Sequence, residues 1–395
     1  MIRHAAWFCL LPLIAVLATD PTPQPPSGSP AELGFDPGRL EELHAVMSEA
    51  IAARQTPGAV IVVVRRGKIA FRQAYGRRAV EPAPVPMTAD TIFDLASLTK
   101  PVATATAIMV LEQQGKLGIQ DRVSSRLPEF NRHGKGDITI EHLLLHTSGL
   151  IADNPLSDYA DGPERAWERI CDLKLQARPG ERFVYSDVGY IVLGKLVEQV
   201  SGRPLNVFAR EEIFQRLGMT DTGFLPSAAL RARCAPTEKL DGTFLQGVVH
   251  DPRARKLGGV AGHAGLFSTG DDLARFATLF LRKGMKEEPG LLSADTLAEM
   301  IRPRPVPGGR RALGWDVETA YSGNRGDRFP AGSFGHTGFT GTSIWIDPGS
   351  ETAVIFLSNR VHPDGKGNVN QLRGKVSSIV AAALEPPLPL RARQP

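Results

Sequence analysis

Cysteine is scarce in this sequence, with three among 395 residues. Cys9 lies in an apolar stretch near the N-terminus, and Cys171 and Cys234 stand far apart. This spacing excludes a disulfide framework and the paired cysteines of a structural zinc site. We expect Cys171 and Cys234 to be separate buried thiols. The chain also lacks Gly-x-Ser-x-Gly, the motif that surrounds the nucleophile of α/β-hydrolases.

Long apolar runs are missing as well. The stretch 5–18 is too short to span a bilayer comfortably, which takes about 20 residues. It follows a short basic start, and Val16-Leu17-Ala18 places small residues at the −3 and −1 positions of a signal-peptidase site. We therefore expect residues 1–18 to be a signal peptide and the mature protein to be periplasmic or secreted. An uncleaved N-terminal anchor is the alternative, and no stable membrane span is expected.

No strong excess of charge is present, because 46 basic residues face 42 acidic ones. The basic residues are scattered and form no stripe interleaved with aromatics, so we expect no nucleic-acid partner. The contents of 42% hydrophobic and 22% charged residues are typical of a soluble globular chain with a large core. No internal repeat of 20–50 residues is present.

The order of apolar patterns predicts one catalytic domain with an insertion. Residues 19–34 are rich in Pro and Ser and are expected to form a disordered linker. The pattern predicts a helix capped by Asp36, with Pro37 in its first turn, and a final helix from Asn370 to about Leu384. Strands are expected at 59–64, 69–75, 334–337, 342–347 and 352–358.

The region between these ends, from about 97 to 300, is mostly helical in pattern. We expect an α+β fold in which one sheet is built from both termini and flanked by helices, with an inserted all-α lobe. The single domain would cover 35–388, divided into an α/β lobe (35–95 and 300–388) and a helical lobe (96–299). The active site should lie in the cleft between the lobes.

Ser97 and Lys100 are the candidate nucleophile and its proton partner. They stand three residues apart at the start of an apolar run, and positions i and i+3 share one face of a helix. A serine hydroxyl needs a nearby base to become a nucleophile, and an amine can provide one. No other serine in the chain has a lysine three residues later. Ser-x-x-Lys is the acylation signature of penicillin-interacting enzymes.

Two further motifs carry chemistry. Tyr185-Ser186-Asp187 precedes a predicted helix, and a tyrosine beside a cationic lysine can be held partly as phenolate and act as a base. The second motif is the glycine-rich strand that contains His336, Thr337, Gly338 and Phe339. Glycine there lets the backbone approach a ligand closely, and a hydroxyl beside a basic residue can hold a carboxylate or carbonyl.

With these motifs in the order Ser-x-x-Lys, Tyr-x-Asp, His-Thr-Gly, the chain resembles the serine β-lactamase and penicillin-binding-protein superfamily, in its class-C-like branch. The stretches Leu143–Leu150 and Gly258–Thr269 add to the likeness. Together they resemble exported low-molecular-weight penicillin-binding proteins of the DD-carboxypeptidase type. The resemblance covers about 35–385 and implies a β-lactamase/transpeptidase-like fold with a mostly antiparallel sheet.

The resemblance also implies roles for the residues. Ser97 would be acylated, Lys100 would be its proton partner and Tyr185 the second base. The backbone N–H groups of Ser97 and Phe339 would form the oxyanion hole, and Thr337 and Gly338 would line the substrate strand. Expected partners are small-molecule or peptidoglycan-peptide substrates and β-lactams as covalent ligands. No metal or cofactor is expected.

Two positions depart from the family pattern. Asp187 stands where Asn is common, and a carboxylate beside Lys100 favours the ammonium form, which shifts the base role toward Tyr185. His336 stands where Lys is frequent. Histidine is mostly neutral at pH 7 and holds a carboxylate less firmly, so we expect Asp187 and His336 to shape substrate binding and β-lactam turnover to be weak.

Alternatives to this interpretation remain. A β-lactamase-fold esterase is nearly indistinguishable by sequence from a DD-peptidase, and a non-catalytic penicillin- or wall-binding protein could share the scaffold. A zinc hydrolase is disfavoured, because His142 and His146 are four apart without the glutamate of His-Glu-x-x-His. His263 is expected either to line the cleft or to brace a turn.

Overall fold

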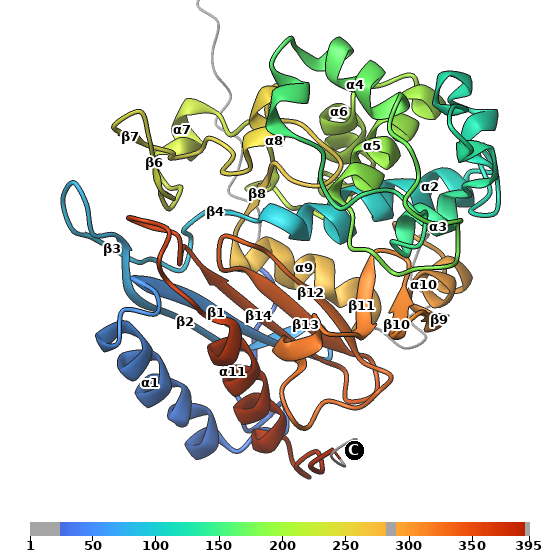
Figure 1. The fold of residues 1–395 in the computed structure, drawn as a ribbon. Helices are drawn as coiled ribbons and strands as arrows, with labels where there is room; N and C mark the ends of the chain where they lie inside the picture. The colour runs from blue at the N-terminus through green and yellow to red at the C-terminus, as the bar shows by residue number, and fades with distance from the viewer. Residues whose placement is uncertain (1–23, 282–289, 392–395) are drawn as a thin grey trace, which may run out of the picture.

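The computed structural model of the protein describes residues 24–281 and 290–391. A nine-stranded sheet in the order β3-β2-β1-β14-β13-β12-β11-β10-β9 forms its centre (Figure 1). The strands are β1 (Gly58–Arg65), β2 (Lys68–Ala79), β3 (Val85–Pro86), β9 (Arg304–Val306), β10 (Gly309–Ala312), β11 (Trp315–Glu318), β12 (Phe334–Thr337), β13 (Ser343–Asp347) and β14 (Thr352–Ser358). The N-terminal strand β1 pairs antiparallel with the C-terminal strand β14, so the expected sheet built from both ends of the chain is confirmed.

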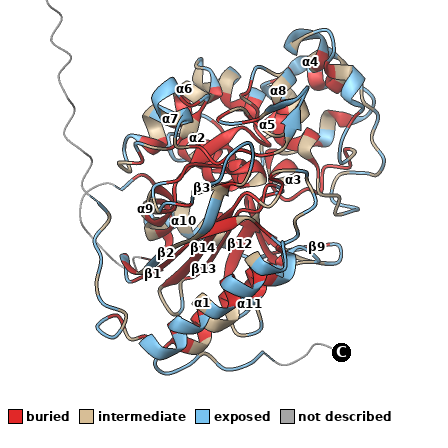
Figure 2. Ribbon diagram, turned by 90° about the vertical axis from the view of Figure 1, so that its left-hand side faces the viewer, coloured by how far each residue is buried: buried red, intermediate tan, exposed pale blue. Residues whose placement is uncertain are grey.

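Side chains alternate between the two faces of a strand, and in β1 the side chains on both faces are buried. Val60 and Val62 belong to the core that the sheet shares with the helical lobe. Ile61 and Val63 belong to a second core on the opposite face. The continuous apolar run of this strand is thus explained by two layers of helices, one on each side of the sheet (Figure 2).

The outer layer consists of α1 (Pro37–Ala52) and α11 (Asn370–Ala383), which pack side by side on the sheet (Figure 1). The Asp36 side chain accepts a hydrogen bond from Gly38 N at 2.9 Å, which caps α1 as predicted. One stripe of α1 is buried: Leu40, Leu43, Val46, Met47 and Ala50. Both terminal helices match the sequence-based prediction.

The other face of the sheet carries α9 (Gly270–Leu281), which packs against β1, β13 and β14. Sequence analysis placed this segment in the helical lobe, whereas it belongs with the sheet. The remaining helices are α2 (Thr106–Gln113), α3 (Ile140–Leu144), α4 (Pro163–Cys171), α5 (Asp187–Ser201), α6 (Leu205–Ala209), α7 (Ala228–Arg231), α8 (Pro252–Lys256) and α10 (Ala294–Ile301). Among the described residues, no helix is long and apolar enough to cross a membrane.

Two short sheets accompany this lobe, one in the order β4-β8-β5 and one made of β6 and β7. Their strands are β4 (Phe93–Asp94), β5 (Gly223–Phe224), β6 (Lys239–Leu240), β7 (Thr243–Phe244) and β8 (Leu266–Ser268). Strand β4 leads into the candidate nucleophile, so this small sheet helps to fix the start of the active-site segment. Cys171 and Cys234 are separate and buried, as expected.

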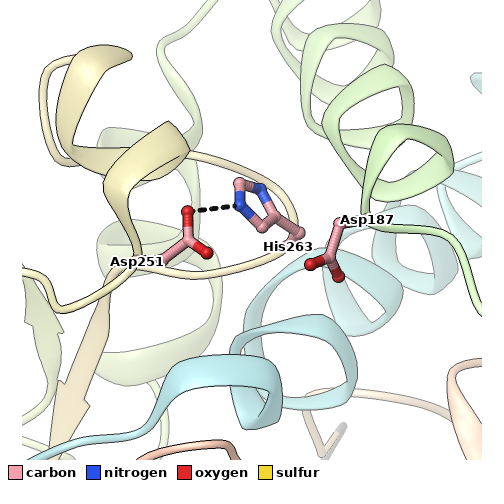
Figure 3. A group of neighbouring side chains, drawn as sticks. All are labelled: Asp187, Asp251 and His263. Carbon is pink, nitrogen blue, oxygen red and sulfur yellow. Dashed lines mark hydrogen bonds and ion pairs between the residues drawn. The ribbon is translucent and has the colours of Figure 1, made fainter. Parts of the chain in front are cut away.

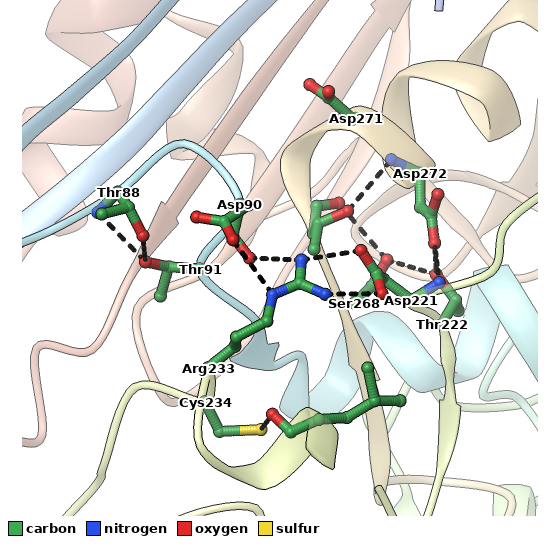
Figure 4. Close-up of polar contacts among 12 residues, drawn as sticks. Thr88, Asp90, Thr91, Asp221, Thr222, Arg233, Cys234, Ser268, Asp271 and Asp272 are labelled. Carbon is green, nitrogen blue, oxygen red and sulfur yellow. Dashed lines mark hydrogen bonds and ion pairs between the residues drawn. The ribbon is translucent and has the colours of Figure 1, made fainter. Parts of the chain in front are cut away.

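Polar contacts tie β8 and the start of α9 to the loop that precedes α7 (Figure 4). Arg233 forms ion pairs with Asp90 and Asp221, at 3.1 and 2.7 Å. The Asp272 carboxylate accepts hydrogen bonds from Asp221 N and Thr222 Oγ1, at 2.9 and 2.8 Å. These contacts link the helical lobe to the layer beneath it.

The segment 24–34 differs from the prediction of a disordered linker. Ser27 forms a β-bridge with Ile69, and Gly28 N donates to Ile69 O at 3.1 Å. Leu33 is buried against the outer core. Proline-rich composition suggested disorder, but proline is tolerated at the edge of a sheet, where this segment lies. Residues 19–23 and the predicted signal peptide lie outside the described residues.

Candidate active site

Ser97 lies in an irregular segment rather than in the regular α-helix that its spacing to Lys100 suggested. A 3₁₀ turn (η1, Ala96–Leu98) is followed by a π-helical stretch (η2, Lys100–Ala105), and only then does α2 begin. The two side chains still meet, with Lys100 Nζ 3.0 Å from Ser97 Oγ. Non-α turns of this kind are frequent at functional sites.

The turn that presents Ser97 is held by Asp94. Ala96 has a φ of 46°, a region that side-chain-bearing residues rarely adopt. The Asp94 carboxylate accepts hydrogen bonds from Ala96 N at 2.8 Å and from His250 N at 2.7 Å. Burial raises the pKa of Asp94, while these two N–H donors oppose that shift. Asp94 therefore positions the nucleophile, a role that no sequence pattern indicated.

Lys100 is fully buried, and its ammonium group has three oxygen partners. They are Ser97 Oγ at 3.0 Å, His263 O at 3.1 Å and Asp187 Oδ1 at 2.6 Å. Burial lowers the pKa of Lys100, but the Asp187 carboxylate and Tyr185 raise it by more, so the net pKa lies above its ordinary value. An ammonium with three acceptors donates to Ser97, so Lys100 in this state is no base for Ser97.

Tyr185 is the remaining candidate base. Its buried hydroxyl interacts with Lys100 and Ser97, although it makes no hydrogen bond of ordinary geometry among the described residues. Burial raises the pKa of Tyr185 by more than the Lys100 cation lowers it, so the net pKa lies above its ordinary value and the phenolate is a minor form at pH 7. The ring stacks on His146 with centroids 4.4 Å apart. Tyr185 thus lies against both members of the Ser-x-x-Lys pair, as expected.

The loop around Tyr185 is fixed by hydrogen bonds to its neighbours. Ser186 caps α5 by accepting a hydrogen bond from Gly189 N at 3.0 Å, and its hydroxyl donates to Ile151 O at 2.6 Å. His146 Nδ1 accepts from Ser186 N at 2.9 Å. His142 Nδ1 likewise accepts from Thr139 N at 3.1 Å. These two histidines therefore bind the backbone, which leaves the zinc-hydrolase alternative without support.

His263 braces a turn rather than lining the cleft. Its side chain is 1% exposed, and its Nε2 atom is 2.9 Å from Asp251 Oδ1 (Figure 3). Burial raises the pKa of Asp251, but the neighbouring His263 lowers it by more, so the net pKa is well below its ordinary value. Ligand atoms of Asp187, Asp251 and His263 lie within 4.8 Å of one another. The Lys100 ammonium already balances the charge of Asp187 in this group.

Strand β12 brings the third motif to Ser97. A side chain at Gly338 would collide with Leu95 O and Thr342 Oγ1. The glycine therefore lets β12 close against the segment that carries Ser97, in addition to lining the cavity. Phe339, directly after it, is 62% exposed at the cavity wall, and Thr337 also lines the cavity.

His336 is buried and uncharged at neutral pH. Burial and the cations Arg311 and Lys100 push its pKa well below the ordinary value. Its Nδ1 atom is 2.8 Å from Thr337 O, which makes Nδ1 the protonated ring nitrogen. The prediction that His336 lacks a charge therefore agrees with the structure, and this residue is not a cationic anchor.

A cavity of about 450 Å³ opens beside these groups. Ser97, Tyr185, His336, Thr337, Gly338 and Phe339 line it, whereas Lys100 and Asp187 lie behind. Sequence analysis missed its basic residues, which are Arg311, Arg360, Lys366 and Arg373. They come from a strand, from loops and from a helix, so no spacing pattern could have indicated them together.

Arg373 lies in α11 and is nearly buried. Its Nη2 atom donates to Gly338 O at 2.6 Å, and Nη1 is 3.4 Å from Asn370 Oδ1. Burial, with help from Arg360, lowers the pKa of Arg373 to about 9, so it remains a cation at pH 7. Arg373 therefore supplies at the end of β12 the positive charge that His336 does not.

Comparison of the chain with known protein families agrees with this site geometry. The family model described as Beta-lactamase matches residues 43–375. The chain belongs to the β-lactamase family. Its fold and its place among the serine hydrolases are those that the sequence motifs predicted.

Relatives of this β-lactamase-family protein carry hydrolase names. A protein of Escherichia coli K12 named "Putative D-alanyl-D-alanine carboxypeptidase" is 30% identical over 399 residues and 92% of each chain. An "N-acetylmuramyl-L-alanine amidase" of Bacillus subtilis 168 is 33% identical over 389 residues and 86% of each chain. The names agree with the resemblance to penicillin-binding proteins and differ in the bond that is cut.

Two solved structures share the fold. EstCE1, "a hydrolase with promiscuous acyltransferase activity", superimposes with a TM-score of 0.71 at 26% identity, covering 87% of this chain and 99% of its own. An octameric penicillin-binding protein homologue from Pyrococcus abyssi gives a TM-score of 0.67 at 26% identity, covering 81% and 73%. This chain is therefore similar both to a hydrolase with acyltransferase activity and to a penicillin-binding protein homologue.

Proposed function

We propose that this protein is an exported serine hydrolase that works through a covalent acyl-Ser97 intermediate, with DD-carboxypeptidase-like activity on peptidoglycan peptides. The observation that carries the proposal is the meeting of Ser97 Oγ, Lys100 Nζ and the Tyr185 hydroxyl beside the cavity, which Ser97 and Tyr185 line and behind which Lys100 lies. Export rests on the predicted signal peptide at 1–18, and the mature enzyme would act in the periplasm or outside the cell.

In the proposed reaction, the Tyr185 phenolate takes the proton of Ser97 as Oγ attacks the scissile carbonyl. The N–H groups of Ser97 and Phe339 stabilise the oxyanion, and Tyr185 then gives the proton to the leaving amine. Water then attacks the acyl carbonyl and gives a proton to the same phenolate, and Tyr185 passes that proton to Ser97 Oγ as the acyl group leaves. Lys100 stays an ammonium throughout and stabilises the phenolate charge.

The basic residues at one end of the cavity favour a substrate that ends in a carboxylate. Arg373 remains charged at pH 7, and Arg360 and Lys366 line the same wall. A free C-terminal carboxylate, as in D-Ala-D-Ala, suits such a wall because guanidinium groups bind carboxylates well. The relatives named for carboxypeptidase and amidase activities add support for peptidoglycan-derived substrates.

Weak β-lactam turnover follows from His336. A neutral imidazole with its protonated Nδ1 turned to Thr337 O supplies no cation where a lysine is common in the family. We expect β-lactams to acylate Ser97 and to be released slowly. Hydrolysis of nitrocefin at the rate of an efficient β-lactamase would contradict this expectation.

An esterase is the second candidate, favoured by the likeness to EstCE1. A non-catalytic penicillin- or wall-binding protein is a poorer fit, because Ser97, Lys100 and Tyr185 are all chemically competent and correctly grouped.

One assay separates these candidates. Purified protein is given the pentapeptide L-Ala-γ-D-Glu-L-Lys-D-Ala-D-Ala, with D-Ala release as the readout, and p-nitrophenyl butyrate in parallel. We expect D-Ala release that Ser97→Ala abolishes. Ester hydrolysis without D-Ala release would replace the proposal by the esterase, and no Ser97-dependent turnover of either compound would contradict a hydrolase.

A further inference from the structure

Arg311 is a buried cation in the cavity wall that the proposed mechanism does not use. It lies in β10, and its side chain is 0% exposed. Its Nη1 atom is 3.3 Å from Asp316 Oδ1. The Nε and Nη2 atoms have no hydrogen-bond partner among the described residues. A buried polar group without a partner is rare and calls for an explanation.

The contact with Asp316 does not account for the buried charge of Arg311, because other groups already donate hydrogen bonds to this carboxylate. Its Oδ1 atom accepts from Thr319 Oγ1 at 2.6 Å, and its Oδ2 atom accepts from Ser322 Oγ at 2.5 Å. The Arg311 contact is the longest of the three. Asp316 is thus held mainly by hydroxyl groups of its own loop, and three of the five N–H donors of the Arg311 guanidinium stay unused.

Arg311 is one of the residues that line the cavity that holds Ser97. Tyr185 and Tyr321 line it as well. The Arg311 Cζ atom lies 5.5 Å from the centre of the Phe183 ring, and Phe183 in turn contacts Tyr321. Tyr321 is 48% exposed and is the exposed member of this aromatic group. A ligand would therefore approach Arg311 past the Tyr321 ring.

The two free atoms also have a specific geometry. Nε–H and Nη2–H lie on one edge of a guanidinium and point in parallel, which matches the two oxygens of a carboxylate. Lysine could not offer this pair of donors.

We propose that the Nε–Nη2 edge of Arg311 binds a substrate carboxylate when Tyr321 turns aside, so that Arg311 determines specificity for acidic substrates. The proposal rests on the hydrolase function above and adds a second carboxylate site to it. This site is separate from the basic end at Arg373, because Arg373 contacts Gly338 at the end of β12 whereas Arg311 lies on β10, two strands away in the sheet.

The test compares matched ester pairs that differ by one carboxylate. Mono-p-nitrophenyl glutarate is compared with its neutral amide, p-nitrophenyl 4-carbamoylbutyrate, which places the charge on the acyl side. 4-(Butyryloxy)benzoate is compared with its methyl ester, which places the charge on the leaving group. For at least one pair, wild-type protein should prefer the acid over the neutral partner by tenfold or more, with the difference mainly in KM.

Arg311→Met should abolish that preference, so that the loss in kcat/KM is at least tenfold larger for the acidic ester than for its neutral partner. Arg310→Met is the matched control, because Arg310 lies one residue away, is 43% exposed and pairs with Glu318 without lining the cavity. It should keep the preference. Arg311→Lys retains the charge without the paired N–H edge and should show an intermediate preference. This variant also tests the proposal if Arg311→Met folds poorly.

Three results would overturn the proposal: no preference in wild-type protein, the same preference in wild type and Arg311→Met, or an equal loss for acidic and neutral esters in folded Arg311→Met. The last result would make Arg311 a structural support. Failure of the serine-hydrolase activity on which this inference rests is a separate outcome, because wild-type protein would then hydrolyse none of the esters in a Ser97-dependent way.

Discussion

At the scale of single residues, the protonation of the active site depends on Asp187. A carboxylate 2.6 Å from Lys100 holds the amine as ammonium, and all three of its donors then point at oxygen atoms. In the proposed mechanism, the proton of Ser97 consequently goes to Tyr185. The sequence predicted this coupling from the residue types alone, since an Asp beside a Lys favours the charged pair.

Replacement of Asp187 by Asn should move the pH–rate profile. The Asp187 charge raises the pKa of Lys100 and of Tyr185, so its removal lowers both. A base that acts in its deprotonated form then becomes available at lower pH. We expect the rising limb of kcat/KM for Asp187→Asn to move to lower pH. Where Tyr185 is mostly protonated, a pKa lower by one makes its phenolate about tenfold more abundant. An unchanged profile would show that Asp187 does not control the base.

At the scale of elements, the site depends on how β12 meets the turn around Ser97. Gly338 allows the end of β12 to contact Leu95, and Asp94 holds the strained Ala96 turn. The sequence indicated the glycine-rich strand but suggested that it approaches a ligand. The contact partner is largely the chain itself, which no single-sequence pattern can reveal because the two segments are over 240 residues apart.

Gly338→Ala should damage both packing and catalysis. The added methyl group would meet Leu95 O and Thr342 Oγ1, and strand β12 would have to shift. We expect a loss of about 1–3 kcal/mol in unfolding free energy, as for other overpacked sites, measured by urea denaturation. Acylation should slow by more than tenfold, because the shift displaces the Phe339 N–H. Gly332→Ala is the control, since a Cβ there meets open space. Equal behaviour of the two variants would argue against the tight contact.

At the scale of the whole molecule, the sequence predicted the architecture better than the site. The sheet from both termini, the terminal helices and the helical insertion followed from apolar periodicity, which depends on burial. Strands β9–β11 were missed because they are short and interrupted by Arg, Pro, Gly or acidic residues. Arg311 and Arg373 were missed for another reason. Only the tertiary fold carries these isolated basic side chains to the same cavity.

Stability of the junction between the layers should depend on pH through Asp272. Burial raises the pKa of Asp272 from its ordinary 3.8 to about 6, so the folded state binds its proton more tightly than the unfolded state. The stability that the protonated Asp272 side chain gives to the folded state is therefore lost as the pH rises from about 4 to 6. Asp272→Asn should be more stable than wild type at pH 7, by about 2–3 kcal/mol, with the gain vanishing near pH 4.

Urea denaturation at several pH values measures this difference. The asparagine can still accept from Asp221 N and Thr222 Oγ1, so those hydrogen bonds are kept. Asp271→Asn, at the neighbouring and more exposed position, serves as control. A stability difference between Asp272→Asn and wild type that does not vary with pH would contradict the raised pKa.

The central claim, that Ser97 is acylated with Tyr185 as its base, is tested most directly by trapping the acyl-enzyme. Purified wild-type protein is incubated with a fluorescent penicillin, and the labelled peptide is identified by mass spectrometry. The account predicts one covalent adduct on Ser97, no labelling of Ser97→Ala, and labelling of Tyr185→Phe slowed by a hundredfold or more. Adduct formation on another residue, or labelling of Tyr185→Phe at the wild-type rate, would contradict it.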